Sequence, residues 1–94
     1  MKKLSKEEVT ARLAAFPQWK VDGERLFREF TFSSFARAFG FMTSVAIVCE
    51  TMDHHPEWLN VYTTLKVWLS SHEVAGISER DFELAERIDS LPVG

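Results

Sequence analysis

The sequence is poor in the residues on which disulfide-rich and cysteine-based metal proteins depend. Its 94 residues contain a single cysteine, four glycines and three prolines. One cysteine excludes an internal disulfide framework and any zinc module built on several cysteines, and it suits a reducing compartment. The first eight residues are mostly charged or polar and lack the apolar run of a signal peptide. These absences predict a cytoplasmic protein.

An excess of positive charge and long apolar runs are also missing. Eleven Lys and Arg stand against 14 Asp and Glu, which gives a formal net charge of −3 at pH 7. The basic residues are scattered along the chain, so we expect no direct binding to nucleic acid. The most apolar stretch, residues 35–49, includes Arg37 and several hydroxyl side chains and is too short to cross a bilayer. We therefore expect no membrane attachment.

Apolar and aromatic side chains are plentiful. Hydrophobic residues make up 46% of the chain and aromatic residues 13%, with eight Phe and three Trp. This content is typical of folded proteins and far above that of disordered segments. Because the length allows one hydrophobic core, we expect residues 1–94 to form a single domain.

Hydrophobic periodicity and turn signals predict seven helices and strands in the order α-β-β-α-β-β-α. The expected helices cover residues 5–15, 34–53 and about 79–91, and the expected strands cover residues 18–22, 25–32, 58–63 and 64–71. Paired strands separated by helices favour antiparallel pairing. The sequence therefore predicts an α+β fold with a four-stranded antiparallel sheet and the helices packed on one face.

Capping signals set the limits of the helices. Ser5 and Glu8 match the Ser-x-x-Glu capping box, and Ser78 with Asp81 looks like a second cap of this kind. The long middle helix has to end near His54, because His55 precedes Pro56 and a proline ring disfavours helical backbone at the preceding residue.

Turn signals differ between the two expected hairpins. Asp22-Gly23 between the first two strands is a strong hairpin signal. No glycine separates residues 58–63 from 64–71, so the second hairpin is predicted from alternation alone. In its first strand Leu59 and Val61 share one face.

The long helix has a wider apolar face than one sheet can cover. At 100° per residue, its predicted stripe consists of Phe35, Ala38, Phe39, Met42, Val45, Ala46 and Cys49, widened by Phe41 and Val48. Surplus apolar surface of this kind indicates an interface between copies. Gly40 would allow another backbone to approach closely. We therefore expect a homo-dimer or homo-tetramer formed through helix 34–53.

All three histidines lie where an expected element ends. His54 and His55 follow the long helix, and His72 follows the last strand. Glu50 lies at i−4 from His54, where a carboxylate can fix the tautomer of the ring. Because histidine both donates and accepts protons near neutral pH, this grouping suits general acid-base catalysis.

Two other interpretations remain open at this point. The histidines can simply cap the helix end, or they can bind a metal ion together with Glu50 and Asp53. Cys49 lies on the apolar stripe and is interpreted as a core residue. The chain has no glycine-rich phosphate loop and no nucleophile elbow, so we expect no nucleotide cofactor.

The segments around these histidines resemble the signature of the pterin-4a-carbinolamine dehydratases. The matching residues are Glu50-Thr-Met-Asp-His54-His55-Pro56-Glu57-Trp58-Leu-Asn60-Val-Tyr62, then Ser71-His72-Glu73, then Gly76-Ile-Ser78-Glu79-Arg80-Asp81. Residues 35–42 are similar to the family's long helix. The resemblance covers roughly residues 19–89.

The resemblance implies an enzyme that needs neither metal nor other cofactor. Members of the family remove water from the 4a-hydroxytetrahydropterin left by pterin-dependent aromatic amino acid hydroxylases, giving quinonoid dihydropterin in tetrahydrobiopterin recycling. By this likeness His54 and His72 protonate the departing hydroxyl group. His55 holds the ring and helps remove the N5 proton, and Glu50 matches the family's supporting acid.

The resemblance also implies a binding site, a fold and a second possible role. The expected substrate-binding residues are His54, His55, Pro56, Ser71, His72, Glu73 and Val74, with the backbone near residues 71–74 against the pterin. The family fold is a four-stranded antiparallel sheet with helices on one face, and its members are dimers or tetramers. Animal members also bind a homeodomain transcription factor through the long helix. A non-catalytic dimerisation cofactor is therefore the alternative function.

Overall fold

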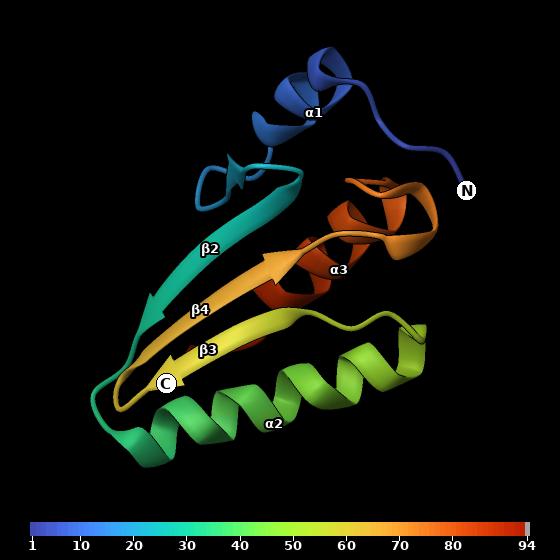
Figure 1. Cartoon of the computed structure of the whole chain (residues 1–94). Helices are drawn as coiled ribbons and strands as arrows, with labels where there is room; N and C mark the ends of the chain where they lie inside the picture. The colour runs from blue at the N-terminus through green and yellow to red at the C-terminus, as the bar shows by residue number, and fades with distance from the viewer. Residues whose placement is uncertain (94) are drawn as a thin grey trace.

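The computed structural model describes residues 1–93 and confirms the predicted order α-β-β-α-β-β-α (Figure 1). The elements are α1 Lys6–Leu13, β1 Lys20–Asp22, β2 Arg25–Thr31, α2 Phe35–Met52, β3 Glu57–Val61, β4 Thr64–Leu69, a single 3₁₀ turn η1 His72–Val74, and α3 Glu79–Asp89. The expected bounds differ from these by a few residues, mainly because both predicted hairpins included their flanking loops.

The four strands form one antiparallel sheet in the order β1-β2-β4-β3. β2 and β4 lie at the centre, where Leu26 pairs with Leu69 and Phe30 with Leu65. These four side chains lie on the same face and belong to the buried core. α2 and α3 contribute the other large share of that core, while α1 lies beyond the start of β2 (Figure 1). Among residues 1–93, no helix covers the opposite face of the sheet (Figure 1).

The two hairpins turn in different ways. Gly23 has φ of 65°, a left-handed conformation that glycine adopts without steric cost. In the β3–β4 turn it is Tyr62 that takes a left-handed φ of 54°. The second hairpin is therefore confirmed, although its turn carries no glycine. Leu59 and Val61 do share a face of β3, but this face is turned away from the helices and leaves them 51% and 63% exposed.

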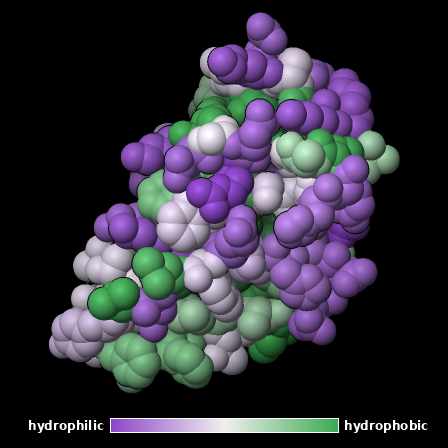
Figure 2. Space-filling view, viewed as in Figure 1, coloured by the Kyte–Doolittle hydropathy of each residue, from purple (hydrophilic) through white to green (hydrophobic). Residues whose placement is uncertain are grey.

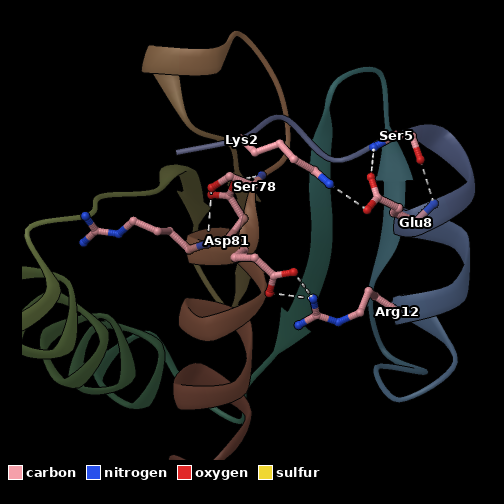
Figure 3. Close-up of polar contacts among 8 residues, drawn as sticks. Lys2, Ser5, Glu8, Arg12, Ser78 and Asp81 are labelled. Atoms are coloured by element: carbon pink, nitrogen blue, oxygen red, sulfur yellow. Dashed lines mark hydrogen bonds and ion pairs between the residues drawn. The ribbon is translucent and has the colours of Figure 1, made fainter.

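The helix caps form as their sequence signals predict. The Ser5 side chain accepts from the Glu8 N–H, and the Glu8 carboxylate accepts from the Ser5 N–H at 2.8 Å (Figure 3). This backbone N–H, together with the ammonium group of Lys2, holds the pKa of Glu8 below its ordinary value. Ser78 and Asp81 make the same reciprocal bonds at the start of α3. Arg12 of α1 bonds Glu79 and so connects the first and last helices.

The buried stripe of α2 is narrower than predicted and is rotated around the helix. Its buried residues are Ala38, Phe41, Val45, Cys49 and Met52. Phe35 and Phe39, which belong to the predicted stripe, are 50% and 56% exposed, and Ile47 is 64% exposed. A helix that packs on one sheet face buries about one row at i, i+3, i+4 and i+7 spacing, and the remaining apolar residues stay outside. Figure 2 shows apolar surface gathered along the margin where α2 lies in Figure 1.

By length and composition alone, α2 would be long and apolar enough to cross a membrane. It has 18 residues and a mean hydropathy of 1.2. The apolar stretch considered too short in the sequence, residues 35–49, is three residues shorter than this helix. The same values occur in core helices of soluble proteins, and α2 contributes its buried row to the core here. Within that row, burial raises the pKa of the Cys49 thiol to about 11, which keeps it neutral.

Candidate functional site

The end of α2 places His54 and His55 in different environments. The helix ends at Asp53, which takes a left-handed conformation with φ of 51°. This turn directs the chain away from the helix axis, so adjacent residues diverge. His54 is 8% exposed and belongs to the buried polar residues, whereas His55 is exposed. His72 is also exposed and begins η1, directly after Ser71, which pairs with Gly76 in an isolated β-bridge beyond the end of β4.

The carboxylate partner of His54 is Asp81. The prediction that Glu50 pairs with His54 is wrong. His54 Nε2 lies 2.6 Å from Asp81 Oδ1, and Asp81 is completely buried. Glu50 instead bonds the other histidine, with its Oε1 2.8 Å from His55 Nε2. The i−4 rule applies only while the backbone is helical, and the left-handed Asp53 breaks that spacing before His54.

Asp81 is the centre of a buried hydrogen-bond network. Its Oδ2 accepts from the Ser71 hydroxyl at 2.9 Å and from the Ser78 N–H at 2.9 Å. The two serine hydroxyl groups are 2.7 Å apart, and both serines are completely buried. Figure 3 shows the contact between Ser78 and Asp81 at the start of α3. From the sequence, Asp81 was interpreted as a helix cap and as part of the family signature, but not as the partner of His54, because a Ser-x-x-Asp pattern gives no sign of a third partner.

This network joins the two chain segments that carry the histidines. One Asp81 carboxylate bonds His54, at the end of α2, and Ser71, the residue directly before His72. Arg80 adds a second connection, since its guanidinium donates to the Met52 carbonyl in the last turn of α2. The start of α3 therefore holds the end of α2 and the end of β4 together.

The remaining candidate residues lie around this point. Pro56 and Val74 are half-buried, and Glu73 is exposed on η1. Ala75 ends η1 with a left-handed φ of 51°, and Ser71 pairs with Gly76 across it. Because the Ser71 hydroxyl faces Asp81 inside the protein, its side chain is not available at the surface.

Two other features concern ligands. Within residues 1–93, no three side chains of His, Cys, Asp or Glu are grouped so that they could hold a metal ion. A hollow of about 560 Å³ lies between α1 and the β1–β2 turn, and a second of about 440 Å³ lies beside Glu79 and Arg80. The three histidines line neither hollow.

Comparisons with known proteins cover nearly the whole chain. The family described as Pterin 4 alpha carbinolamine dehydratase matches residues 2–91. A relative from Solibacter usitatus is 45% identical over 98% of this chain and 97% of its own length. Another, from Burkholderia multivorans, is 50% identical over 95% of this chain and 89% of its own length. Both are provisionally named pterin-4-alpha-carbinolamine dehydratases.

A solved structure agrees with these sequence matches. A Brucella melitensis protein, described as a transcriptional coactivator/pterin dehydratase, has a TM-score of 0.92 and is 38% identical. The match covers 99% of this chain and all of that one. The chain therefore belongs to the pterin-4a-carbinolamine dehydratase family, a family of hydro-lyases.

Proposed function

We propose that this protein eliminates water from 4a-hydroxytetrahydropterin to give quinonoid dihydropterin, and that it does so in the cytoplasm as a step of tetrahydrobiopterin recycling. The observation that carries the proposal is the buried carboxylate of Asp81, which bonds both His54 and Ser71, the residue next to His72. The segments that carry His54 and His72 are thereby connected to each other, in a protein of the dehydratase family.

The proposed reaction needs one proton delivered and one removed. The C4a–O bond breaks as the N5 lone pair forms the C4a=N5 bond, and a proton supplied to the hydroxyl group lets it leave as water. Loss of the N5 proton then gives the neutral product. Positioned acids and bases typically contribute about 10² to 10⁴ in rate. Histidine side chains can therefore supply this chemistry without a cofactor.

The two paired histidines suit different parts of this reaction. The His54 pair is nearly buried, with side-chain exposures of 9% for His54 and none for Asp81. We assign His54 and His72 to protonation of the leaving hydroxyl group. The His55–Glu50 pair is exposed, at 54% and 78%, so it can exchange protons with water. We assign this pair to holding the pterin and removing the N5 proton.

The proposed substrate contacts follow from the same arrangement. Pro56 would contact the ring beside His55, and the backbone of Ser71, Glu73 and Val74 would contact its polar edge. Pterin edges carry both hydrogen-bond donors and acceptors, which suit backbone groups in a turn such as η1. Residues 1–94 would act as one catalytic domain.

An absorbance assay with the purified chain tests the function. We expect the ultraviolet change that reports dehydration of 4a-hydroxytetrahydropterin to be faster with the protein than without it. The rate should persist after exhaustive treatment with a chelator. A rate equal to the uncatalysed one would contradict the dehydratase proposal, and activity lost with the chelator would support the metal-site interpretation instead.

We also propose that the outer face of α2 joins copies of this chain into a homo-dimer or homo-tetramer. Three large apolar side chains on this helix, Phe35, Phe39 and Ile47, are each at least half exposed. Single apolar residues scattered over a surface are common, but several on one helix indicate a binding surface. An added Cβ at Gly40 would meet nothing within 4 Å, so this part of the helix surface is open to a close neighbour. The same surface would serve the alternative function of a non-catalytic dimerisation cofactor.

Sedimentation with matched variants tests the oligomer. Wild-type protein is expected to sediment as a dimer or tetramer, and Phe39→Glu to sediment as a smaller species, because a buried unpaired charge opposes association. Val93→Glu is the control, since Val93 is similarly exposed, at 51%, outside α2. A monomeric wild type, or an unchanged mass for Phe39→Glu, would contradict the proposed interface. An oligomer without dehydratase activity would favour the alternative function.

A further inference from the structure

We infer that Asp81, supported by Ser71 and Ser78, keeps the ring hydrogen of His54 on Nε2 and leaves Nδ1 as the atom that exchanges a proton with the substrate. The inference rests on the proposed function and makes it specific to one ring atom. Asp81 and the two serines are then positioning residues, because each acts through His54.

The direction of the hydrogen bonds follows from counting donors at Asp81. The Ser78 N–H is a backbone group and can only donate to Oδ2. The backbone N–H of Arg80 donates to the Ser78 hydroxyl oxygen. The Ser78 hydroxyl hydrogen is then free for Ser71, and the Ser71 hydroxyl hydrogen goes to Oδ2.

Two donors on Oδ2 exclude a hydrogen on that oxygen, and hydrogen bonds donated to a carboxylate stabilise its charged form. We therefore infer that Asp81 accepts at Oδ1 as well, and that the hydrogen of the short contact belongs to His54 Nε2. In the neutral ring, Nδ1 is then the atom without a hydrogen. This fixes one tautomer of His54 by geometry that lies entirely inside the protein.

The other ring nitrogen remains reachable. Among residues 1–93, His54 Nδ1 makes no hydrogen bond within the chain, yet no buried side-chain nitrogen or oxygen is left unpaired. Nδ1 therefore contributes to the small exposed part of this residue, which is 8% of its surface. A protonated Nδ1 can donate to a departing hydroxyl group while Nε2 stays bound to Asp81.

The variant that tests this is Asp81→Asn, which has nearly the same shape. Its amide oxygen should stay with the donors Ser71 and Ser78, which turns the amide NH₂ group toward His54 Nε2. Nε2 would then have to accept, and the ring hydrogen would move to Nδ1. Loss of the correct tautomer in a comparable histidine–aspartate pair lowers kcat by about 10⁴. We expect kcat to fall by about 10² to 10⁴ with a much smaller change in KM.

The tautomer can be measured without substrate. Long-range ¹H–¹⁵N correlation spectra of the ¹⁵N-labelled full chain, at a pH where the rings are neutral, should show His54 protonated at Nε2 in the wild type and at Nδ1 in Asp81→Asn. Glu50→Gln is the matched control, since it makes the same chemical change at the His55 pair and should leave the His54 tautomer unchanged.

Each outcome decides the inference. A wild-type His54 with its hydrogen on Nδ1 would overturn it, even if the Asp81→Asn variant did not fold. An unchanged tautomer in a folded Asp81→Asn protein would also overturn it. The expected tautomers in a protein without dehydratase activity would support the hydrogen-bond network and contradict the proposed function, so the two failures are distinguishable.

Discussion

The His54→Gln variant is expected to fold normally and to turn over substrate about 10² to 10⁴ times more slowly than wild type. The amide nitrogen of glutamine can take the place of Nε2 and donate to Asp81, which keeps this buried carboxylate paired. Glutamine cannot transfer a proton near neutral pH, so the acid is removed while the hydrogen bond stays. His72→Ala should lower turnover by a similar factor, because the second acid is lost.

Steady-state rates and urea denaturation together check this prediction. His72 is exposed and makes no side-chain hydrogen bond within residues 1–93, so its removal should leave the unfolding midpoint nearly unchanged. His54→Ala is the contrasting variant, because it leaves Asp81 Oδ1 buried without a donor and should lower the midpoint as well as the rate. Wild-type turnover in either His54→Gln or His72→Ala would remove that residue from the mechanism.

The Asp81→Ala variant is expected to lose about 3 to 5 kcal/mol of unfolding free energy, because three buried donors lose their acceptor and each unpaired donor costs about 1 to 3 kcal/mol. The change removes the acceptor for His54, Ser71 and the Ser78 N–H at once. It also removes half of the capping box that begins α3. Because small domains are stable by about 5 to 15 kcal/mol, this loss is a large fraction of the total.

Urea or thermal denaturation followed by circular dichroism measures this loss. Glu83→Ala is the control on the same helix, since its pair with Arg87 is about half exposed on both sides. Exposed pairs of this kind contribute about 0 to 1 kcal/mol. A loss in Asp81→Ala no larger than that of Glu83→Ala would show that the buried network does not stabilise the fold.

The fold could be predicted largely from local signals. Helix caps such as Ser5 with Glu8 involve residues three apart, so the sequence shows both partners directly. The Asp22-Gly23 turn is equally local. The β3–β4 hairpin was predicted from alternation, but the choice of its core face was not, because Leu59 and Val61 alternate just as regularly as buried residues do.

The site was predictable only in part. The positions of His54 and His72 at element ends follow from Pro56 and from the strand pattern. The partner of His54 does not, since Asp81 is 27 residues away and reaches it only after α3 has packed against α2. The rotation of α2 was missed for a related reason, because periodicity gives an apolar arc and tertiary packing decides which row of it is covered.

The two duties of Asp81 connect folding to chemistry. The same carboxylate caps α3 and bonds the imidazole of His54 at the end of α2. A molecule in which the start of α3 has frayed therefore also loses the orientation of that ring. Partly unfolded molecules should consequently have no catalytic activity rather than a reduced one. Deleting residues from the C-terminal side should abolish activity before the sheet unfolds.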